Sequence, residues 1–370
     1  MSAVRTGGNV IPLRSAAAPQ PQLLLLGTGT VGSAFARRYA QLRERLALPP
    51  LALIANSRSA EACHADPVSV LASVAASQRC RGALQIDPNA FARGDIVVDA
   101  SASDHVADLH ARWLERGVHV VTANKLGAGA GLERALDILH AQDTAQARYA
   151  DAATVGAGLP LIRSIRALAQ GGDRIRSVEG VLSGSLAWLF NRYDGTRPFS
   201  SLVREARDAG YTEPDPRMDL SGEDVRRKLL ILARAAGLRL HEEEIQVESL
   251  VPAALADASP DDADALLSTL DTPLLERFRQ SRRAGEVLRF VGKFAVDGAG
   301  KVSASVGLRA LPAAHPLCGG SGTDNIVAIH SCRYEHQPLV IQGPGAGAEV
   351  TAAALLDDVI AIAEAGRRFA

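Results

Sequence analysis

A short glycine pattern near the N-terminus constrains the fold of this chain more than any other feature. Residues 22–42 read "QLLLLGTGTVGSAFARRYAQL", which predicts a buried strand, a tight turn and an amphipathic helix. Gly27, Gly29 and Gly32 form G-x-G-x-x-G in that turn. The first glycine permits the turn, the second lets the backbone approach a pyrophosphate, and the third allows close helix packing. The pattern predicts a dinucleotide site, with a glycine-rich turn that binds nothing as the alternative.

Three further apolar runs extend this beginning into a parallel sheet. They read "LALIANS" (51–57), "DIVVDAS" (95–101) and "VHVVTANK" (118–125), and helical patterns lie between them. Each run ends in small polar residues, at the edge where open parallel sheets bind ligands. The first part of the chain therefore has the βαβ rhythm of a Rossmann-type domain.

The end of the second strand indicates which dinucleotide is preferred. Sites that prefer NAD usually carry an acid there, which binds the ribose 2′-hydroxyl. This chain has Asn56, Ser57 and Arg58 instead. No acid would repel a 2′-phosphate and Arg58 could pair with one, so we expect NADP rather than NAD. The alternative for Arg58 is a solvated loop charge.

After about residue 152 the pattern changes to that of a second, α+β domain. "LRFVGKFAV" and "KVSASVGLRAL" predict antiparallel strands joined by the turn "DGAG". A final strand and apolar helix, residues 339–370, are expected to return to the first domain. We predict an α/β fold with a disordered tail (1–21), a dinucleotide-binding domain (22–152, completed by 339–370) and a substrate-binding and dimerisation domain (153–338).

Composition narrows the range of partners. A net charge of -1, from 40 basic and 41 acidic residues, gives no attraction to nucleic acid or lipid surfaces, and no apolar run is long enough to span a membrane. The cysteines lack zinc or disulfide spacing, which favours a reducing cytoplasm. They are Cys63, Cys80, Cys318 and Cys332. The histidines at 105, 110, 119 and 140 lack ligand spacing and are interpreted as structural.

Lysine is rare in this chain, and its positions are informative. Only four of the 40 basic residues are Lys, at positions 125, 228, 293 and 301. Arg serves equally well in a surface ion pair but does not release its proton in a protein, whereas Lys can. Lys228 follows Arg226 and Arg227. Its retention as Lys points to proton chemistry.

The residues around Lys228 form an acidic helix start. Ser221 is expected to cap a helix through an S-x-x-D box with Asp224, and Gly237 to end it. Asp224 and Lys228 then lie four apart on one face, which an ordinary surface pair would also explain. The preceding loop gathers acids that could grip a cationic group. They are Glu213, Asp215 and Asp219.

These residues also carry a family resemblance. Residues 210–228, "GYTEPDPRMDLSGEDVRRK", resemble the signature of homoserine dehydrogenases. Further blocks agree: "VVTANK", "TVGAGLPLI", "GVLSGSLAWLFN" and "GAGAEVTAAA". The likeness spans about residues 22–364 and is closest to the dehydrogenase half of bifunctional aspartokinase/homoserine dehydrogenases, here without a kinase part or an ACT domain. Met218 stands where many relatives have an acid, so that position is not expected to be essential.

The resemblance implies an activity and roles for the residues that match. The family interconverts L-aspartate 4-semialdehyde and L-homoserine with NAD(P), on the route to threonine and methionine. Lys228 is implied as the general acid/base and Lys125 as the residue near nicotinamide and substrate, a shared or exchanged role being the alternative. Glu213 and Asp224 are implied to hold the polar groups of the substrate, and Asp219 to support them. Ser185 matches a small hydroxyl residue beside the substrate, or is a plain turn serine.

Cofactor and cation sites are implied in the same way. Thr30 and Val31 match the phosphate turn, Ser101 the nicotinamide side and Gly347 the closing glycine turn. A monovalent cation such as sodium is implied to bind main-chain carbonyls in the loop "ATVGAGL". Those carbonyls belong to Ala152, Val155, Ala157 and Leu159. A homodimer through the second domain is implied as well.

Two other classes of function are alternatives for this chain. Aspartate-semialdehyde dehydrogenase acylates a cysteine beside a histidine base, and Cys318 before "GGSG" is the only candidate. A dinucleotide-sensing protein that is not an enzyme would be expected to have lost Lys228, Lys125 or the acidic loop. All of these are present in the chain.

Overall fold

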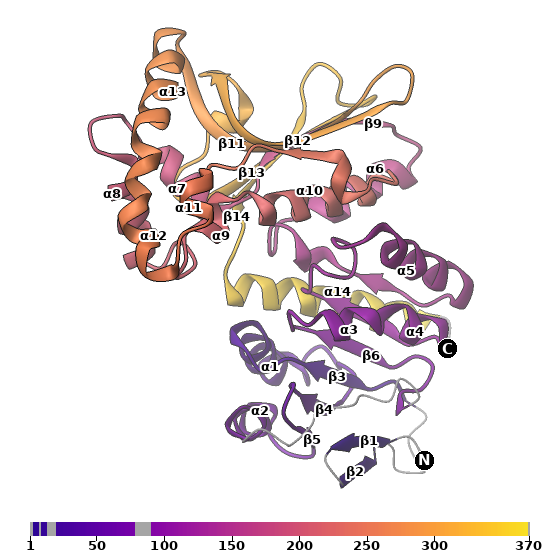
Figure 1. Cartoon of the computed structure of the whole chain (residues 1–370). Coiled ribbons are helices and arrows are strands. Elements are labelled where there is room, and N and C mark those ends of the chain that lie inside the picture. Colours follow the sequence, from indigo (N-terminus) through magenta and orange to yellow (C-terminus); the bar gives the residue numbers. More distant parts are fainter. Residues whose placement is uncertain (1–2, 7–8, 13–19, 78–89, 369–370) are drawn as a thin grey trace. The chain divides into compact units, whose positions relative to one another are not determined.

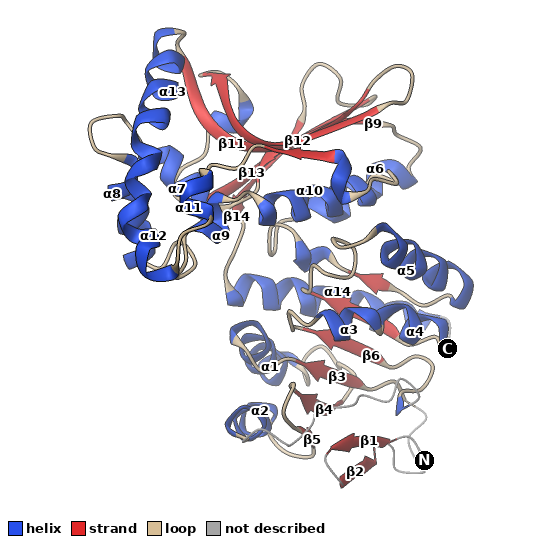
Figure 2. Cartoon of the chain, in the orientation of Figure 1, coloured by secondary structure: helices blue, strands red, loops and turns tan. Residues whose placement is uncertain are grey.

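The computed structural model describes residues 3–6, 9–12, 20–77 and 90–368. The chain divides into two compact units, the first made of residues 1–158 and 346–370 and the second of residues 159–345. Each unit is built on its own six-stranded sheet (Figures 1 and 2). The predicted limits at 152 and 338 lie a few residues earlier in the chain. None of the helices in the described part combines the length and the apolar character that crossing a bilayer requires.

The first unit contains a mostly parallel sheet. Its strands are β3 (Leu23–Leu26), β4 (Leu51–Ala55), β5 (Ala60–Ala62), β6 (Ile96–Asp99), β7 (His119–Thr122) and β8 (Tyr149–Ala150). Their order is β5-β4-β3-β6-β7-β8, and only β5, at one edge, runs antiparallel to its neighbour. This arrangement confirms the predicted Rossmann-type sheet.

Helices cover both faces of this sheet, as its strand sequences require. Leu24 and Leu26 of β3 pack into one core and Leu23 and Leu25 into another, because alternate residues of a strand point to opposite faces. The helices of the unit are α1 (Thr30–Leu42), α2 (Pro67–Ala76), α3 (Asp104–Asp108), α4 (His110–Glu115), α5 (Leu132–Ala145), the 3-10 turn η2 (Ala152–Thr154) and α14 (Ala348–Arg368). Trp113 of α4 lies in the first core and Leu355 of α14 in the second.

The second unit contains a largely antiparallel sheet. Its strands are β9 (Ile175–Val181), β10 (Ile245–Val247), β11 (Glu286–Val296), β12 (Val302–Pro312), β13 (Asp324–Ser331) and β14 (Leu339–Pro344). The order is β10-β12-β11-β9-β13-β14, with β10 parallel to β12. The predicted hairpin of β11 and β12 is confirmed, since the two strands pair antiparallel from Glu286↔Pro312 to Val296↔Val302.

Helices pack on this second sheet (Figure 2). They are α6 (Leu161–Gln170), α7 (Gly184–Arg192), α8 (Phe199–Asp208), α9 (Arg217–Leu220), α10 (Glu223–Ala235), η3 (Glu242–Glu244), α11 (Ala253–Ala256), α12 (Pro260–Leu266), η4 (Leu267–Leu270), α13 (Asp271–Arg283) and η5 (Pro316–Cys318). Helix α10 lies close to the sheet because β11 has Gly292 there: a Cβ on this glycine would lie 3.1 Å from Val225 Cγ1. The close packing fixes one face of α10 against the sheet.

Two expectations about the ends of the chain are corrected. Residues 339–344 do not join the first sheet, because β14 pairs with β13 of the second. Their burial alternates between half-buried and exposed, as in an antiparallel edge strand, whereas β3 is buried throughout. The tail, expected to be disordered, contains paired strands β1 (Ala3–Thr6) and β2 (Asn9–Pro12). Its Val and Ile content favours strands. Residues 1–2, 7–8 and 13–19 lie outside the described part.

Candidate active site

The glycine turn in the first unit has the geometry of a phosphate cradle. Gly27 has φ +107°, and a Cβ there would lie 2.7 Å from the carbonyl oxygen of Ala100. A Cβ on Gly32 would lie 2.0 Å from the Gly27 carbonyl oxygen, so α1 can approach β3 only because this residue is glycine. Around Gly29 nothing lies within 4 Å of a Cβ position. The turn is closed on its protein side and open at its middle glycine, as a bound pyrophosphate requires.

The helix that follows this turn presents its N-terminus without a side-chain cap. Gly29 is the N-cap of α1 and makes no capping hydrogen bond, and Thr30 and Val31 are the first residues of the helix. Gly29 and Thr30 are exposed. Uncapped N–H groups at a helix start attract anions. The residues predicted for the phosphate turn therefore fit a dinucleotide.

At the end of β4, Asn56 ties the glycine turn to its surroundings. Its Nδ2 donates to Thr28 Oγ1 at 3.0 Å and to the carbonyl oxygen of Val74 at 3.0 Å. Its Oδ1 accepts the backbone N–H of Arg58 at 2.8 Å. The Arg58 guanidinium is half-buried and donates to the Ala75 carbonyl at 2.9 Å. Arg58 is thus held at the carboxyl edge of the sheet with a fixed orientation.

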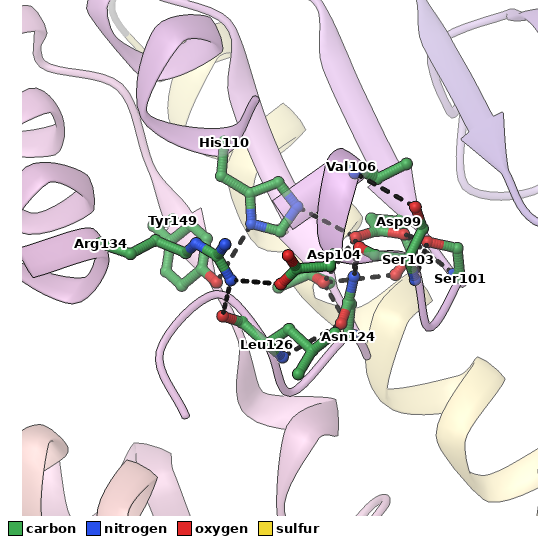
Figure 3. A network of polar contacts seen from close by, with 11 residues as sticks. Asp99, Ser101, Ser103, Asp104, Val106, His110, Asn124, Leu126, Arg134 and Tyr149 are labelled. Carbon is green, nitrogen blue, oxygen red and sulfur yellow. Dashed lines mark hydrogen bonds and ion pairs between the residues drawn. The ribbon is translucent and has the colours of Figure 1, made fainter. Parts of the chain in front are cut away.

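The residues after β6 and β7 lie at the same edge of the sheet. Ser101 donates its N–H and its Oγ–H to Asp99 Oδ1, at 2.9 and 2.6 Å. Lys125 is half-buried, and its carbonyl accepts Gly129 N–H at 2.8 Å to begin a turn. Asn124, immediately before Lys125, donates to Asp99 Oδ2 at 3.0 Å (Figure 3). The sequence interpretation missed Asp99 and Asn124, although an acid that ends the apolar run "IVVD" was a signal that it needs buried donors.

The loop that resembles a cation site has an unusual backbone. Gly156 and Ala157 are consecutive residues in the left-handed region, with φ +75° and +52°. Ala152, Val155 and Ala157 are buried. Within the described part of the chain, the carbonyls of Val155 and Ala157 accept no hydrogen bond. Leu159, the first residue of the second unit, accepts Leu161 N–H at 2.8 Å, so its carbonyl keeps one lone pair.

Gly347 lies one residue before α14, in the first unit. Its φ is +126°, a conformation that other residues rarely adopt. Its carbonyl accepts the N–H of Thr351 at 3.0 Å and the Oγ–H of Thr351 at 2.8 Å. The glycine therefore makes the turn by which the chain enters α14.

In the second unit, Lys228 is a buried lysine with defined partners. It is 9% exposed, on the inner face of α10. Its Nζ lies 2.7 Å from Asp224 Oδ2 and donates to the carbonyl oxygen of Leu182 at 2.8 Å. The predicted pairing across one helical turn is confirmed. Leu182 was not predicted, because a backbone acceptor leaves no trace in the sequence.

A chain of hydrogen bonds runs from the start of α7 to the acidic loop. Ser183 Oγ and Ser185 Oγ lie 2.8 Å apart, and Ser185 donates to Asp219 Oδ1 at 2.7 Å. Asp219 Oδ2 accepts the backbone N–H of Glu213 at 2.9 Å. Ser183 and Ser185 are buried and Glu213 is exposed. Three predicted substrate residues, Ser185, Asp219 and Glu213, are therefore joined in one network.

The acidic loop itself differs from the expectation in two respects. Asp215 does not face a ligand as a free carboxylate, because Arg217 donates to both its oxygens, with 2.7 Å for the shortest contact, and thereby lowers the pKa of Asp215. Ser221 is not the cap of α10: Gly222, with φ +80°, is the N-cap and makes no side-chain bond. Ser221 ends α9 instead, since α9 and α10 are separated by that single left-handed glycine. Gly237, with φ +86°, follows the end of α10 as predicted.

The two units together define a class of protein. A Rossmann-type sheet with an open glycine turn binds nicotinamide dinucleotides, and a buried lysine paired with an aspartate is equipped for proton transfer. This combination is that of a dinucleotide-dependent oxidoreductase.

Comparison with known proteins specifies the family. A family model described as "Homoserine dehydrogenase" matches residues 160–360, and one described as "Homoserine dehydrogenase, NAD binding domain" matches residues 27–150. The chain belongs to the homoserine dehydrogenase family, whose members act on a CH–OH group.

Individual relatives agree with this assignment. A bifunctional aspartokinase/homoserine dehydrogenase of Zea mays is 45% identical over 72% of this chain and 29% of its own length. The chain thus spans under a third of that relative. The homoserine dehydrogenase of Saccharomyces cerevisiae is 35% identical over 92% of this chain and 97% of its own length. Among solved structures, a Candida auris protein of unknown function superposes with a TM-score of 0.81 at 33% identity, covering 93% of this chain and 98% of that one.

Proposed function

We propose that this protein interconverts L-aspartate 4-semialdehyde and L-homoserine, a step toward threonine and methionine, with Lys228 as the general acid/base. Reducing the aldehyde places negative charge on its oxygen, so a proton donor must stand near that oxygen. A bound nicotinamide dinucleotide would supply the hydride, or accept it in the reverse direction. The observation that supports the proposal best is the burial of Lys228 between Asp224 and the Leu182 carbonyl.

Lys228 has the environment that a proton-transferring amine needs. Its Nζ lies 2.7 Å from Asp224 Oδ2 and donates to the Leu182 carbonyl at 2.8 Å, and these contacts hold the ammonium group in place for proton transfer to the substrate oxygen. In the oxidative direction the neutral amine takes the hydroxyl proton of the substrate. Arg could make the same two contacts but could not complete this cycle, because it does not release its proton. Lys125 is proposed to act beside nicotinamide and substrate.

The acids of the second unit are proposed to bind the substrate ammonium. Glu213 is exposed, and within the described residues its carboxylate has no bonded partner. Asp224 is half-exposed beside Lys228. Asp219 orients Glu213 through its backbone N–H and orients Ser185 through its hydroxyl. A carboxylate next to an ammonium forms a charge-assisted hydrogen bond, the strong kind.

For the cofactor we propose NADP in preference to NAD. Arg58 stands after β4, where an NAD-preferring site carries an acid. Its backbone is fixed by Asn56 and one arm of its guanidinium by Ala75, so the remaining N–H groups can receive a 2′-phosphate. Ser101 and Gly347 are proposed on the nicotinamide side and in the closing turn.

A monovalent cation, a homodimer and a cytoplasmic location complete the proposal. Support for the cation comes from the buried carbonyls of Val155 and Ala157, which accept no hydrogen bond among the described residues. The dimer, through the second unit, rests on resemblance. The cytoplasm is supported by free thiols at Cys63, Cys318 and Cys332, Cys80 lying outside the described residues.

Acylation of Cys318, the alternative chemistry, receives little support. A nucleophilic thiol needs a lowered pKa and a neighbouring base. Burial raises the pKa of Cys318, and its Sγ donates to the Pro312 carbonyl at 3.6 Å. No histidine is hydrogen-bonded to this sulfur among the described residues.

The test is reduction of NADP and NAD by the purified protein with L-homoserine at alkaline pH, beside Lys228→Arg. We expect faster reduction of NADP, and a fall in kcat of roughly a hundredfold or more for Lys228→Arg because the proton acceptor is lost. Lys293→Arg is the matched control, since Lys293 pairs with Glu179 at 3.0 Å in the same unit. Full activity of Lys228→Arg would remove the proton-transfer role, and reduction of neither dinucleotide would favour a binding protein.

A further inference from the structure

Asp99 is a fully buried side chain at the carboxyl end of β6 and has no part in the proposed reaction. Its exposed fraction is 0%. An ionised carboxylate in such a place is costly unless donors surround it. Figure 3 shows that donors from three separate segments converge on it. The carboxylate thus joins parts of the first unit that are distant in sequence.

Each oxygen of Asp99 holds one of the two loops at the carboxyl edge of the sheet. Oδ1 accepts from Ser101, through the backbone N–H at 2.9 Å and the hydroxyl at 2.6 Å. Oδ2 accepts from Asn124 Nδ2 at 3.0 Å and lies 3.0 Å from His110 Nε2. The hydroxyl and backbone N–H of Ser101 and the amide NH2 of Asn124 are all donors. Movement of the loop after β6 would leave Oδ1 unpaired, and movement of the loop after β7 would take one donor from Oδ2.

The network extends outward to Tyr149. His110 Nε2 lies 3.0 Å from Asp99 Oδ2, and on the other side of the ring Tyr149 Oη lies 3.4 Å from His110 Nδ1. Gly127 lies against both rings: a Cβ there would lie 2.1 Å from Tyr149 Oη and 3.0 Å from His110 Nδ1. The rings have no room to shift on that side, so His110 is a rigid support for the carboxylate.

Asn124 fixes the backbone on both sides of Lys125. Its Nδ2 donates to the Ser103 carbonyl at 2.9 Å as well as to Asp99, and its Oδ1 accepts the Leu126 N–H at 3.1 Å. The backbone is therefore fixed on either side of Lys125. The same amide links the loop after β7 to the loop after β6.

We propose that Asp99 is a positioning residue that sets the placement of Ser101 and Lys125 relative to each other. This inference rests on the proposed function, in which Ser101 and Lys125 act at the nicotinamide side. A misplacement of about 1 Å of a group near the reacting atoms can cost roughly a hundredfold in rate. The role therefore predicts a loss in kcat from a residue that touches neither substrate nor cofactor.

The decisive variant is Asp99→Asn, with Asp95→Asn as its matched control. An amide at position 99 turns its NH2 toward the donors of one loop and releases that loop. Asp95 is also buried, at 3% exposure, immediately before β6, and accepts Gln22 N–H at 3.1 Å and Ala92 N–H at 2.8 Å. It differs in lying at the opposite end of the strand. Both variants are compared with wild type by Tm, dinucleotide Kd, homoserine KM and kcat.

We expect kcat of Asp99→Asn to fall roughly tenfold to a hundredfold, with the dinucleotide Kd and homoserine KM within about threefold of wild type. Asp95→Asn should lower Tm but leave kcat unchanged. If Asp99→Asn does not fold, Asn124→Ser, which releases the Lys125 loop alone, should show the same fall in kcat.

Two results would overturn the role. One is an Asp99→Asn enzyme, or failing its folding an Asn124→Ser enzyme, that loses Tm but keeps its kcat, as a purely structural acid would. The other is a wild-type protein that reduces neither dinucleotide, because that result removes the proposed function and this role with it. Measuring wild type in every assay separates the two results.

Discussion

Ser183, Ser185 and Asp219 form a hydrogen-bond chain whose direction is fixed by chemistry. Asp219 as a carboxylate only accepts, so Ser185 donates its single proton to it. Ser183 must then donate to Ser185, and its own oxygen accepts Leu186 N–H at 3.3 Å. Ser185 consequently has no proton left and can only accept from a ligand. That polarity suits a substrate that presents an ammonium or a hydroxyl donor.

Ser183→Ala tests this direction. The change removes the N-cap of α7, which should lower the free energy of unfolding by about 1 kcal/mol. It also removes the hydroxyl that orients Ser185 Oγ, so the acceptor that Ser185 presents to the substrate is less well placed. We therefore expect homoserine KM to rise about threefold to tenfold, which corresponds to the weakening of one hydrogen bond. Steady-state kinetics and urea unfolding measure the two effects.

Ser259→Ala provides the comparison for that variant. Ser259 caps α12 in the same way, accepting Asp262 N–H at 3.2 Å in the same unit. Ser259→Ala should lower the free energy of unfolding by a similar amount and leave homoserine KM unchanged. An equal rise in KM for both variants would mean that Ser183 acts through stability alone.

Individual residues were predictable where chemistry restricts the residue type. The scarcity of lysine singled out Lys228, and its spacing from Asp224 gave their ion pair. The Leu182 carbonyl could not be predicted, because every residue has one and only the fold brings this one to Lys228. Asp99 was not identified, because Ser101, His110 and Asn124 are brought together around it only by the fold.

At the scale of elements, the glycines between β3 and α1 are required for different reasons, which can be tested separately. Gly32 is required by packing, since a Cβ would lie 2.0 Å from a backbone oxygen. Gly29 has φ -74° and an open surrounding, so packing alone would tolerate a side chain there. A glycine at an unconstrained position is explained best by a ligand that approaches it closely.

Alanine substitutions at Gly32 and Gly29 separate the packing requirement from the ligand-binding requirement. Gly32→Ala should lower the free energy of unfolding by about 2–3 kcal/mol, as overpacking does. Gly29→Ala should cost about 1 kcal/mol or less in stability, yet raise the dinucleotide Kd by roughly tenfold because it blocks the pyrophosphate. Thermal unfolding and titration of NADPH fluorescence measure both. Unchanged NADPH affinity in Gly29→Ala would place the pyrophosphate elsewhere.

Element types were more predictable than the residues at their ends. Hydrophobic runs located β3, β4, β6 and β7, and the "DGAG" turn gave the hairpin of β11 and β12. The start of α10 was placed wrongly on Ser221, a residue type that also ends helices. Gly222 separates α9 from α10 through its left-handed backbone, with φ +80°, and a Cβ there would lie 2.9 Å from Phe290. The contact with Phe290 is long-range, so no local pattern reveals that it excludes a side chain at position 222.

At the scale of the whole molecule, the first unit is assembled from both ends of the chain. Helix α14 returns to it and contributes Leu355, Leu356 and Val359 to its core. That α14 packs in the first unit was predictable from its apolar run. That β14 pairs in the sheet of the second unit was not. Six residues, "LVIQGP", fit an edge strand of either sheet, and only the pairing with β13 decides.

The stability of the whole molecule should depend on pH through His119, the first residue of β7. Burial, and then the charges of Arg148 and Arg93, lower the pKa of His119 from 6.5 to about 4. Its Nδ1 accepts Arg148 N–H at 2.9 Å, a bond that needs the neutral ring. The unfolded chain binds this proton below about pH 6.5 and the folded one only near pH 4. The contribution of His119 to the free energy of unfolding is therefore complete above pH 6.5. It declines as the pH falls toward 4, by about 3 kcal/mol in all.

His119→Asn, which keeps an acceptor but cannot titrate, isolates this effect from the carboxylates. Urea unfolding at pH 7.5 and pH 4.5 should show the wild type losing about 2 kcal/mol more than the variant between the two conditions. The sign follows from proton uptake on unfolding, which acid favours. Parallel pH dependence in the two proteins would mean that His119 is as easily protonated in the folded chain as in the unfolded one, and that its bond to Arg148 does not require a neutral ring.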